Sequence, residues 1–357
     1  MLKVAREKWI IGRREILRLI LVTILLSTFF PLMWYTKQQS FILLKKTSWM
    51  IDDIKGGLKN FTLQFETLTT RSRVHNSPVK VKPTEKPYKC DGCFSKQFQF
   101  LINNEDICKT KNESIDILIM ITSSPQNKLS RNAIRETWLT HTKMNKGHIR
   151  YVFLLGESPM TKELENENVQ TKDIILGNFK DAYNNLTYKT LMGYQWATKY
   201  CKNAQFVMKT DDDMYVHIPG LTRVINENSK VLQSAVGGNC KQSARPIRNS
   251  RSKWYASLKS YPQKTYPGFC SGTGYITSLN VVTKVIEISK DVPFFHLEDV
   301  YVSLCIKQLG LKLHYIDGFM RTFGLCHNEY NTLVTVHHVS VNTMRRMWET
   351  LCAPKKN

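Results

Sequence analysis

The chain has 357 residues, with 51 Lys and Arg against 29 Asp and Glu, which gives a formal net charge of +22. This length accommodates one large domain, or two small ones, together with attached segments. The basic residues are scattered, and no helix-turn-helix, zinc-finger or aromatic RNA-binding pattern accompanies them, so no nucleic-acid partner is expected.

Residues 19–35 form an apolar run that predicts a single transmembrane helix, at the short end of the length needed to cross a bilayer. The run has no small-residue cleavage site, so an uncleaved signal anchor is favoured over a secretory signal peptide. Basic residues precede it. By the positive-inside rule, residues 1–18 then form a cytosolic tail, and the rest of the chain lies in the lumen of the secretory pathway.

Residues 36–110 are predicted to form a luminal stem followed by a leading segment that disulfides tie to the folded part. The stem composition is polar and basic and ends in a Pro-containing run, which is typical of a tether. Two short apolar stretches, residues 41–44 and 61–68, could form helices through which two copies associate as a homodimer. Residues 111–357 then make up the folded domain.

All nine cysteines, from Cys90 to Cys352, follow the apolar run, and in an oxidising compartment most of them are expected to form disulfides. Because nine is odd, at least one is free or bonded between chains, and the sequence leaves the connectivity open. Cys90 and Cys93 have the spacing of half a zinc site, but no matching second pair follows. Three glycosylation sequons fit a luminal glycoprotein: Asn60, Asn112 and Asn185.

Apolar segments in the folded part predict alternating strands and helices. Strands are expected at residues 115–122, 151–156, 173–176 and 206–210, and helices at residues 130–138, from residue 158, and at 186–200. Ser130 is a candidate N-cap of the first helix, with Ile134 and Trp138 on its inward face. Strict alternation of this kind favours an α/β fold with a mostly parallel sheet covered on both faces. No Gly-rich phosphate loop follows the first strand, so a nucleotide would be held through metal and basic groups.

Three consecutive carboxylates, Asp211, Asp212 and Asp213, follow the strand at residues 206–210. Side chains alternate along an extended segment, so Asp211 and Asp213 are expected to point the same way and Asp212 back toward the protein. Ligands collect at strand ends in open α/β sheets, and carboxylate oxygens suit Mg²⁺ or Mn²⁺. An acidic surface loop is the alternative interpretation of the triplet taken alone.

Six segments, in order, resemble the β1,3-galactosyltransferase family, which also includes β1,3-N-acetylglucosaminyltransferases and fringe enzymes. They are Arg131-Asn-Ala-Ile-Arg-Glu-Thr-Trp138, Phe153-Leu-Leu-Gly156, residues 179–190, Lys209-Thr-Asp-Asp-Asp213, residues 266–275 and Glu298-Asp-Val-Tyr-Val302. The resemblance implies a Rossmann-like nucleotide-sugar fold of the GT-A type. It also implies a single-pass type II Golgi membrane enzyme that transfers a hexose, with inversion, from a UDP-sugar to a hydroxyl of a glycoprotein or glycolipid glycan.

The same resemblance assigns the acidic triplet to Mn²⁺, or Mg²⁺, and the nucleotide. Asp213 is the first expected metal ligand and Asp211 the second, while Asp212 would hold the ribose or the backbone. His337 matches a family histidine near the C-terminus and could complete the coordination shell, with a structural role as the alternative because His338 lies beside it. Such an ion would offset the charge that builds on the departing UDP.

An inverting transfer needs one base and no enzyme nucleophile. The resemblance assigns the base to Asp299 and acceptor binding to Glu298. The apolar residues 292–297 that precede this pair would raise a carboxylate pKa, and capping of the helix expected at residues 300–309 is a compatible role. Candidates for the donor site are Arg131, Arg135 and Lys189, with a solvated helix face as the alternative for these basic residues. The resemblance adds Asp181 as a polar contact of the nucleotide sugar.

The acceptor side is expected around Gly272 and Gly274, which allow close approach of a sugar to the backbone. Trp254, Tyr261 and Tyr266 form an aromatic set suited to stacking on sugar faces, with simple packing as the alternative. Ser303 stands where the family usually has Gly. Galactose is the favoured donor sugar, and N-acetylglucosamine, or N-acetylgalactosamine, is the alternative. A catalytically silent relative that acts as a glycan-binding subunit or folding partner is disfavoured, because neither acidic motif is eroded.

Overall fold

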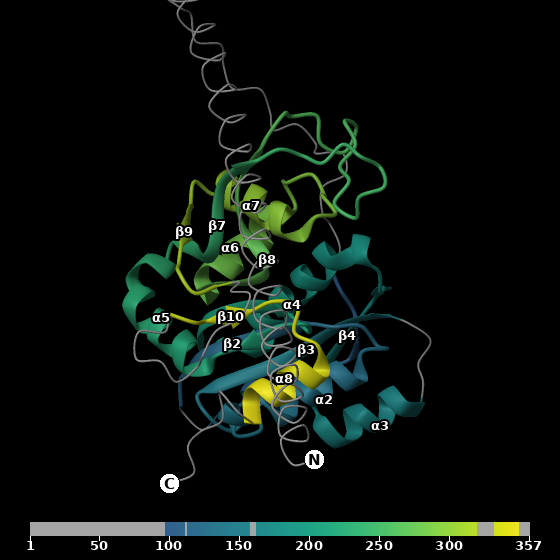
Figure 1. Cartoon of the computed structure of the whole chain (residues 1–357), viewed down its shortest axis with the longest axis vertical. Coiled ribbons are helices and arrows are strands. Elements are labelled where there is room, and N and C mark those ends of the chain that lie inside the picture. Colours follow the sequence, from purple (N-terminus) through teal and green to yellow (C-terminus); the bar gives the residue numbers. More distant parts are fainter. Residues whose placement is uncertain (1–96, 111–112, 158–161, 320–331, 350–357) are drawn as a thin grey trace, which may run out of the picture. The chain divides into compact units, whose positions relative to one another are not determined.

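The computed structural model describes residues 97–110, 113–157, 162–319 and 332–349 (Figure 1). The predicted anchor and stem, and the sequons at Asn60 and Asn112, lie outside these ranges. Within the described ranges, no helix has the length and hydrophobicity that a membrane span requires.

An eight-stranded sheet forms the centre of the described domain. Its order is β1 (Phe100–Ile102), β4 (Ile174–Lys180), β3 (Ile149–Glu157), β2 (Ile115–Thr122), β5 (Ala204–Asp211), β8 (Tyr266–Ser278), β7 (Ala235–Ala244) and β9 (Lys312–Tyr315). Four neighbouring pairs are parallel and three are antiparallel. A separate two-stranded sheet joins β6 (Tyr215–Val216) to β10 (Thr335–Val336). The predicted α/β fold with a mostly parallel sheet is therefore confirmed.

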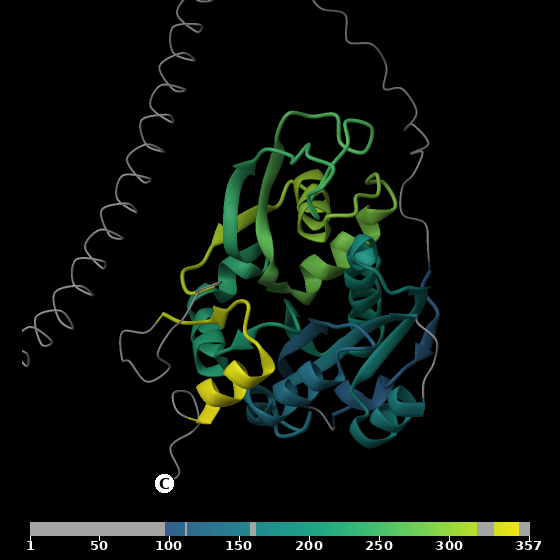
Figure 2. The same cartoon turned by 45° about the vertical axis from the view of Figure 1, so that its right-hand side comes forward.

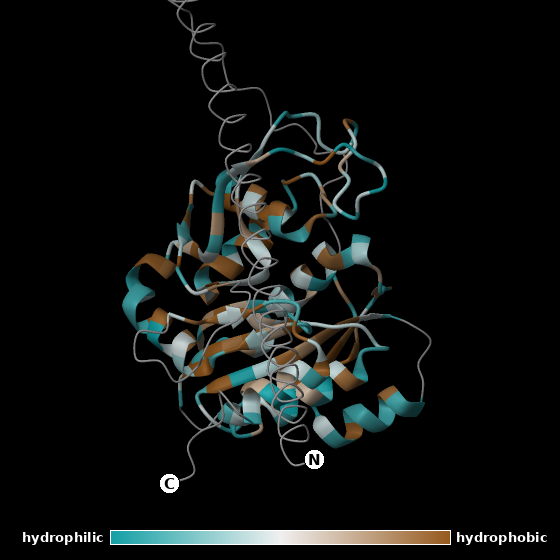
Figure 3. Ribbon diagram, viewed as in Figure 1, coloured by the Kyte–Doolittle hydropathy of each residue, from teal (hydrophilic) through white to brown (hydrophobic). Residues whose placement is uncertain are grey.

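Helices cover both faces of the sheet, as Figures 1 and 2 show. One face packs against α4 (Leu186–Tyr200), α6 (Leu279–Ser289) and α7 (Glu298–Gln308), and the other against α2 (Lys128–Glu136), α3 (Lys162–Thr171), α5 (Ile218–Leu232) and α8 (Val341–Met347). The described residues also contain three short 3₁₀ helices: η1 (Glu105–Cys108), η2 (Trp138–Thr142) and η3 (Tyr183–Asn185). Apolar residues concentrate on the strands, while the outer side of α3 is polar (Figure 3).

The strand β2 shows why the core has two halves. Its side chains alternate, so Leu118 and Met120 join the cluster under α4 and α6, whereas Ile119 and Ile121 join the cluster under α2 and α5. All four are completely buried. A strand with both faces covered reads as a continuous apolar run, and that run correctly predicted the bounds of β2.

The predicted helix at residues 186–200 coincides with α4, but the expected start of the first helix needs correction. Helix α2 begins at Lys128, with Asn127 at the cap position, so Ser130 lies inside the helix and does not cap it. Residues 266–275, for which the sequence analysis predicted no strand, belong to β8, which pairs antiparallel with both β5 and β7. The sequence pattern did not reveal this antiparallel half, because Gly and Pro interrupt the β8 segment and weaken its strand signal.

The leading segment belongs to the folded domain. Strand β1 pairs with β4, and the Cys108–Cys201 disulfide ties η1 to the residue that follows α4. A second disulfide, Cys240–Cys270, joins β7 to β8, and Cys305 is a free, buried thiol. The domain therefore starts before residue 111, at the latest with the first described residues.

Candidate active site

A polar pocket of about 640 Å³ lies at the carboxyl ends of β2 and β5. Its walls come from these strand ends, from the middle of β8, from the start of α7 and from residues 337–338. Parallel strands end at one edge, and ligands in open α/β sheets bind there. The predicted site residues that line it are Asp181, Lys189, Asp211, Asp212, Asp213, Trp254, Gly272, Glu298, Asp299 and His337.

The three carboxylates of the triplet point to three different partners. Asp211 accepts hydrogen bonds from Lys209 Nζ at 2.7 Å and from the Thr122 hydroxyl. Asp212 accepts from Ser123 Oγ at 2.6 Å and from Asn127 Nδ2 at 2.9 Å, which is the inward orientation that the sequence predicted. Burial raises the pKa of Asp212, although these two hydrogen bonds oppose the shift.

Asp213 instead turns toward the C-terminal histidines. The expectation that Asp211 and Asp213 share one direction fails because β5 ends at Asp211, and strict alternation does not continue into the turn that follows. The turn is held from two sides: Trp138 Nε1 donates to Met214 O at 3.2 Å, and Val339 N donates to Asp213 O at 2.9 Å.

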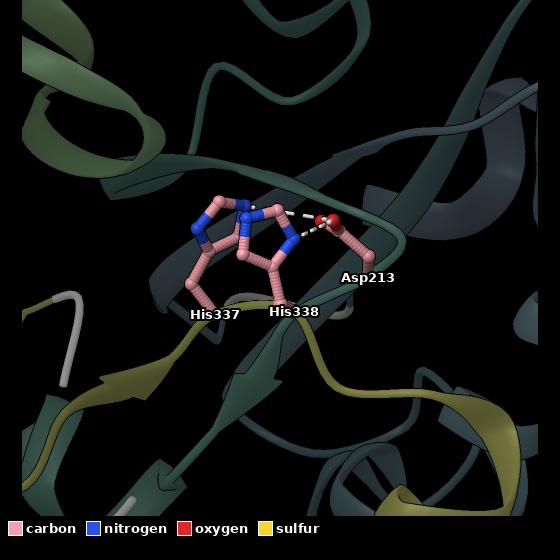
Figure 4. A group of neighbouring side chains, drawn as sticks. All are labelled: Asp213, His337 and His338. Atoms are coloured by element: carbon pink, nitrogen blue, oxygen red, sulfur yellow. Dashed lines mark ion pairs between the residues drawn. The ribbon is translucent and has the colours of Figure 1, made fainter. Parts of the chain in front are cut away.

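Figure 4 shows Asp213 together with His337 and His338. The carboxylate Oδ2 of Asp213 lies 3.5 Å from His337 Nε2 and 3.6 Å from His338 Nδ1. The two imidazole rings stack with their centroids 3.7 Å apart. Each of the three residues offers one metal-binding atom, and these three atoms lie within 4.8 Å of one another. The pairing of β6 with β10 brings these histidines, which follow β10 directly, to the triplet.

This donor set fits a divalent transition ion. One carboxylate oxygen and two imidazole nitrogens suit an ion such as Mn²⁺ better than Mg²⁺, which prefers oxygen ligands only. Burial lowers the pKa of His337, against the opposing charge of Asp213, and the neutral imidazole is the form that binds metals. His338, which was not predicted, thus joins Asp213 and His337 in this cluster, and Asp211 lies outside it.

The carboxylate pair at the start of α7 occupies the other side of the pocket. Glu298 is buried; its Oε1 accepts from the Tyr275 hydroxyl, and its Oε2 lies 3.4 Å from Lys209 Nζ. Asp299 is partly exposed, and its two oxygens accept from Val300 N at 2.9 Å and Gly272 N at 3.3 Å. Burial raises the pKa of both carboxyl groups. Only Asp299 therefore has the exposure of a base, whereas Glu298 is engaged internally rather than free for acceptor hydroxyls.

Lys209 connects the two acidic motifs and was not predicted. Its ammonium is buried between Asp211 at 2.7 Å and Glu298 at 3.4 Å, and it also donates to Gly272 O. Burial alone would lower the pKa of Lys209, but the two carboxylates raise it above its ordinary value. One buried charge thus orients the end of β5, the start of α7 and the β8 backbone.

Replacing Lys209 by Met should destabilise the fold by about 3 kcal/mol or more, because it leaves Glu298 buried without its cationic partner. Differential scanning calorimetry would measure the loss. Lys241→Met, on an exposed residue of the neighbouring strand β7, is the matched control and should behave as wild type. Adding Glu298→Gln to Lys209→Met should recover part of the loss; equal stability of wild type and Lys209→Met would contradict the bridging role.

The donor-side predictions divide in two. Lys189 Nζ pairs with Asp181 Oδ2 at 2.8 Å and donates to Ser123 O, and both residues line the pocket. Arg131 and Arg135 do not line it. Arg131 is fully buried and forms a bidentate pair with Glu167, at 2.8 and 2.7 Å.

Both arginines form ion pairs within the protein, and Arg131 also contacts the loop behind the pocket. Arg135 binds Asp173 through two 2.8 Å contacts. Arg131 also donates to Ser123 Oγ at 3.1 Å and to the carbonyl of Ser124, and Ser123 in turn holds Asp212. Direct contact of these two arginines with a nucleotide is therefore not supported. Arg131 positions the loop after β2, a role that helical spacing alone could not reveal.

The predicted aromatic set also separates. Trp254 is 49% exposed at the pocket mouth, where Lys253 Nζ lies 4.8 Å from its ring. Tyr261 and Tyr266 are buried, pack against Phe295 and do not line the pocket, so the packing alternative is correct for them.

The two glycines differ in the same way. Gly272 lines the pocket, and a Cβ at this position would lie 3.0 Å from Glu298 Oε2. A larger residue would therefore require the Glu298 side chain to move. Gly274 does not line the pocket. Tyr183 and His296 also line the pocket and were not predicted. Tyr183 could have been found, because it belongs to the family-like segment at residues 179–190.

Asn185 is the one predicted sequon within the described residues. It ends η3, beside the pocket-lining Tyr183 and Leu186, and its Nδ2 donates to Lys180 O at 2.8 Å.

The α/β domain thus holds a carboxylate–imidazole cluster and the carboxylate of Asp299 in one pocket. A sequence model of the galactosyltransferase family matches residues 129–317. The chain belongs to this family and is an enzyme of the glycosyltransferase class, which confirms the resemblance found in the six segments.

Two relatives illustrate the similarity. Beta-1,3-galactosyltransferase 1 of Homo sapiens is 36% identical over 266 residues, which is 72% of this chain and 80% of the relative. Beta-1,3-galactosyltransferase 5 of Mus musculus is 38% identical over 245 residues, 66% of this chain and 78% of the relative.

Solved structures are more distant. The galactosyltransferase LgtC in complex with donor and acceptor sugar analogues aligns at 10% identity and a TM-score of 0.38, over 67% of this chain and 98% of that chain. A glycosyltransferase involved in glycosylation of the PBCV-1 major capsid aligns at 12% identity and a TM-score of 0.38, over 66% and 100%. These likenesses are too low to carry an argument.

Proposed function

We propose that this chain is an inverting, Mn²⁺-dependent β1,3-hexosyltransferase with a GT-A type fold, and that it transfers galactose from UDP-galactose to a glycan hydroxyl. The observation that supports this most is that one pocket contains both the Asp213–His337–His338 cluster and the partly exposed carboxylate of Asp299. The first suits an ion on a diphosphate, and the second suits a base.

Asp213, His337 and His338 would hold the ion, which supplies positive charge to the departing diphosphate when bound. Asp299 takes the proton from the attacking hydroxyl of the acceptor. The acceptor oxygen forms its bond to the anomeric carbon while the bond from that carbon to the diphosphate oxygen breaks, so inversion follows from one displacement. Lys209 and the Gly272 N–H keep the Asp299 side of the pocket in place.

As the pH is lowered, kcat/KM should fall with an apparent pKa above the ordinary Asp value of about 3.9. Burial raises the pKa of Asp299. The hydrogen bonds from Val300 N and Gly272 N and the charge of Lys209 lower it, but the effect of burial is larger. A raised pKa means that Asp299 takes up a proton at a higher pH, so activity is lost earlier as the pH falls. A kcat/KM profile with UDP-galactose would measure this, and an apparent pKa at or below the ordinary value would contradict it.

The donor screen is the decisive experiment for the proposed function. UDP-galactose, UDP-N-acetylglucosamine and UDP-N-acetylgalactosamine are each offered with simple sugar acceptors, with Mn²⁺ or with chelator. Transfer from UDP-galactose that requires Mn²⁺ supports the proposal, and exclusive use of UDP-N-acetylglucosamine would favour the alternative donor. Transfer that persists in chelator would overturn the metal assignment.

We also propose a type II Golgi location with the catalytic domain in the lumen, supported by the apolar run at residues 19–35 and the basic residues before it. Glycosidase digestion of protein made in cells should reduce its apparent mass, and protease added to intact microsomes should spare the domain. Digestion of the domain in sealed microsomes would show that the domain faces the cytosol and would contradict the proposed orientation.

A further inference from the structure

A second pocket, of about 780 Å³, lies at the opposite edge of the sheet from the active site. Strands β2, β3 and β5 run in the same direction. The second pocket is lined by Arg150, near the amino end of β3, whereas the active site lies at the carboxyl ends of β2 and β5. Its size falls within the range of about 300–1,000 Å³ that small-molecule sites occupy. Nothing in the proposed transfer reaction uses this pocket.

Arg150 is the feature that points to a ligand. The residue is only 4% exposed, its Nε donates to Ile107 O at 2.9 Å, and its Nη1 is buried with no hydrogen-bond partner among the described residues. Buried guanidinium groups are costly to leave unpaired. The chain meets this cost elsewhere: Arg131 is paired with Glu167, and Arg135 with both Glu167 and Asp173.

The charges around Arg150 favour an anionic ligand. The lining carries four basic and three acidic side chains, and two of the acids, Glu105 and Asp106, both lie within ion-pair distance of Lys109. Lys146 and Lys172 add two exposed cations to the guanidinium. Burial lowers the pKa of Arg150, and the charge of Glu113 offsets this only in part, so a further anion would be stabilised there.

The wall opposite is held in a defined shape. Asn145 Nδ2 donates to Tyr151 O at 3.1 Å, and its Oδ1 accepts from Tyr151 N at 2.7 Å, so the side chain pairs with β3 as another strand would. Lys143, Met144 and Asn145 all have positive φ values, of 51°, 54° and 61°. Non-glycine residues in this region concentrate at ligand-binding segments.

We propose that this pocket binds a sugar-sized ligand through a carboxylate or phosphate group that accepts a hydrogen bond from the guanidinium group of Arg150, which lines the pocket. A bare phosphate or carboxylate would leave most of the volume empty, so the group belongs to a larger molecule. The two sources of the oxyanion, an acidic sugar and a sugar phosphate, differ only in the group that meets the guanidinium.

The test uses the full-length chain and isothermal titration with three probes: glucuronate, glucose 6-phosphate and neutral glucose. Saturating UDP and Mn²⁺ are present throughout to occupy the active site. Glucuronate, glucose 6-phosphate or both should bind, and glucose should not. Arg150→Met should weaken that binding about tenfold or more, the loss of one charge-assisted hydrogen bond. Arg251→Met, on an exposed arginine outside both pockets, is the control and should bind as wild type.

Binding of glucuronate alone identifies a carboxylate ligand, and binding of glucose 6-phosphate alone identifies a phosphate ligand. Should Arg150→Met fail to fold, the double variant Lys146→Met/Lys172→Met at the exposed rim provides the second test and should also weaken binding. The proposal is overturned if neither anion binds, if glucose binds equally well, or if folded Arg150→Met retains wild-type affinity.

Discussion

Asp299→Asn should lower kcat by about 10²–10⁴, the loss expected when a positioned base is removed. The substitution keeps the size of the side chain, and Asn Oδ1 can still accept from Val300 N, whose contact with Asp299 is 2.9 Å. The amide cannot take the acceptor's proton. Because Asp299 lies across the pocket from the Asp213 cluster, the affinity for UDP with Mn²⁺ should stay nearly unchanged; steady-state kinetics and isothermal titration would measure the two quantities.

The controls separate a missing base from a disturbed helix. Asp291→Asn changes an exposed carboxylate after α6 and should leave kcat at the wild-type value. Glu298→Gln should lower thermal stability as well as kcat, since Glu298 meets both Tyr275 and Lys209. Retention of more than about a tenth of wild-type kcat by Asp299→Asn would move the base elsewhere, with Glu298 as the next candidate.

Asp213→Ala should reduce transfer by at least about a hundredfold, because it removes the only carboxylate of the three-residue cluster that would hold the ion. The fold should survive. The Asp213 side chain is 45% exposed, and the contact that anchors the turn runs from Val339 N to the Asp213 backbone carbonyl, which alanine retains. Titration of Mn²⁺ followed by electron paramagnetic resonance should show weakened binding in parallel with the loss of kcat.

Asp116→Ala is the matched control, because Asp116 is an exposed aspartate on β2, and it should bind Mn²⁺ as wild type. His338→Asn tests the added ligand. Asparagine tolerates the positive φ of 59° at this position, so the change removes the imidazole with little backbone strain. Wild-type transfer by Asp213→Ala in chelator-treated buffer would exclude the cluster as the metal site.

The parallel half of the fold could be predicted from the sequence because its signals are local. Strand β2 and helix α4 have the predicted bounds, since a strand buried on both faces and a helix between turn residues each mark their own ends. The antiparallel half was missed. Strand β8 contains Pro267, Gly268, Gly272 and Gly274, and only pairing with β5 and β7 over its length makes this segment a strand.

For the site, the sequence by itself determined the kinds of groups: the acidic triplet, the Glu298–Asp299 pair and a late histidine, which lie in short ordered motifs. Tertiary structure alone decided their partners. It separated Asp211 from Asp213, and it placed Lys209 between two acidic motifs that are far apart in the chain. Burial and pairing between residues far apart in the chain depend on how the sheet packs, and no local sequence pattern predicts them. For the same reason, Arg131 was predicted to contact a ligand, whereas in the structure it forms a buried ion pair with Glu167.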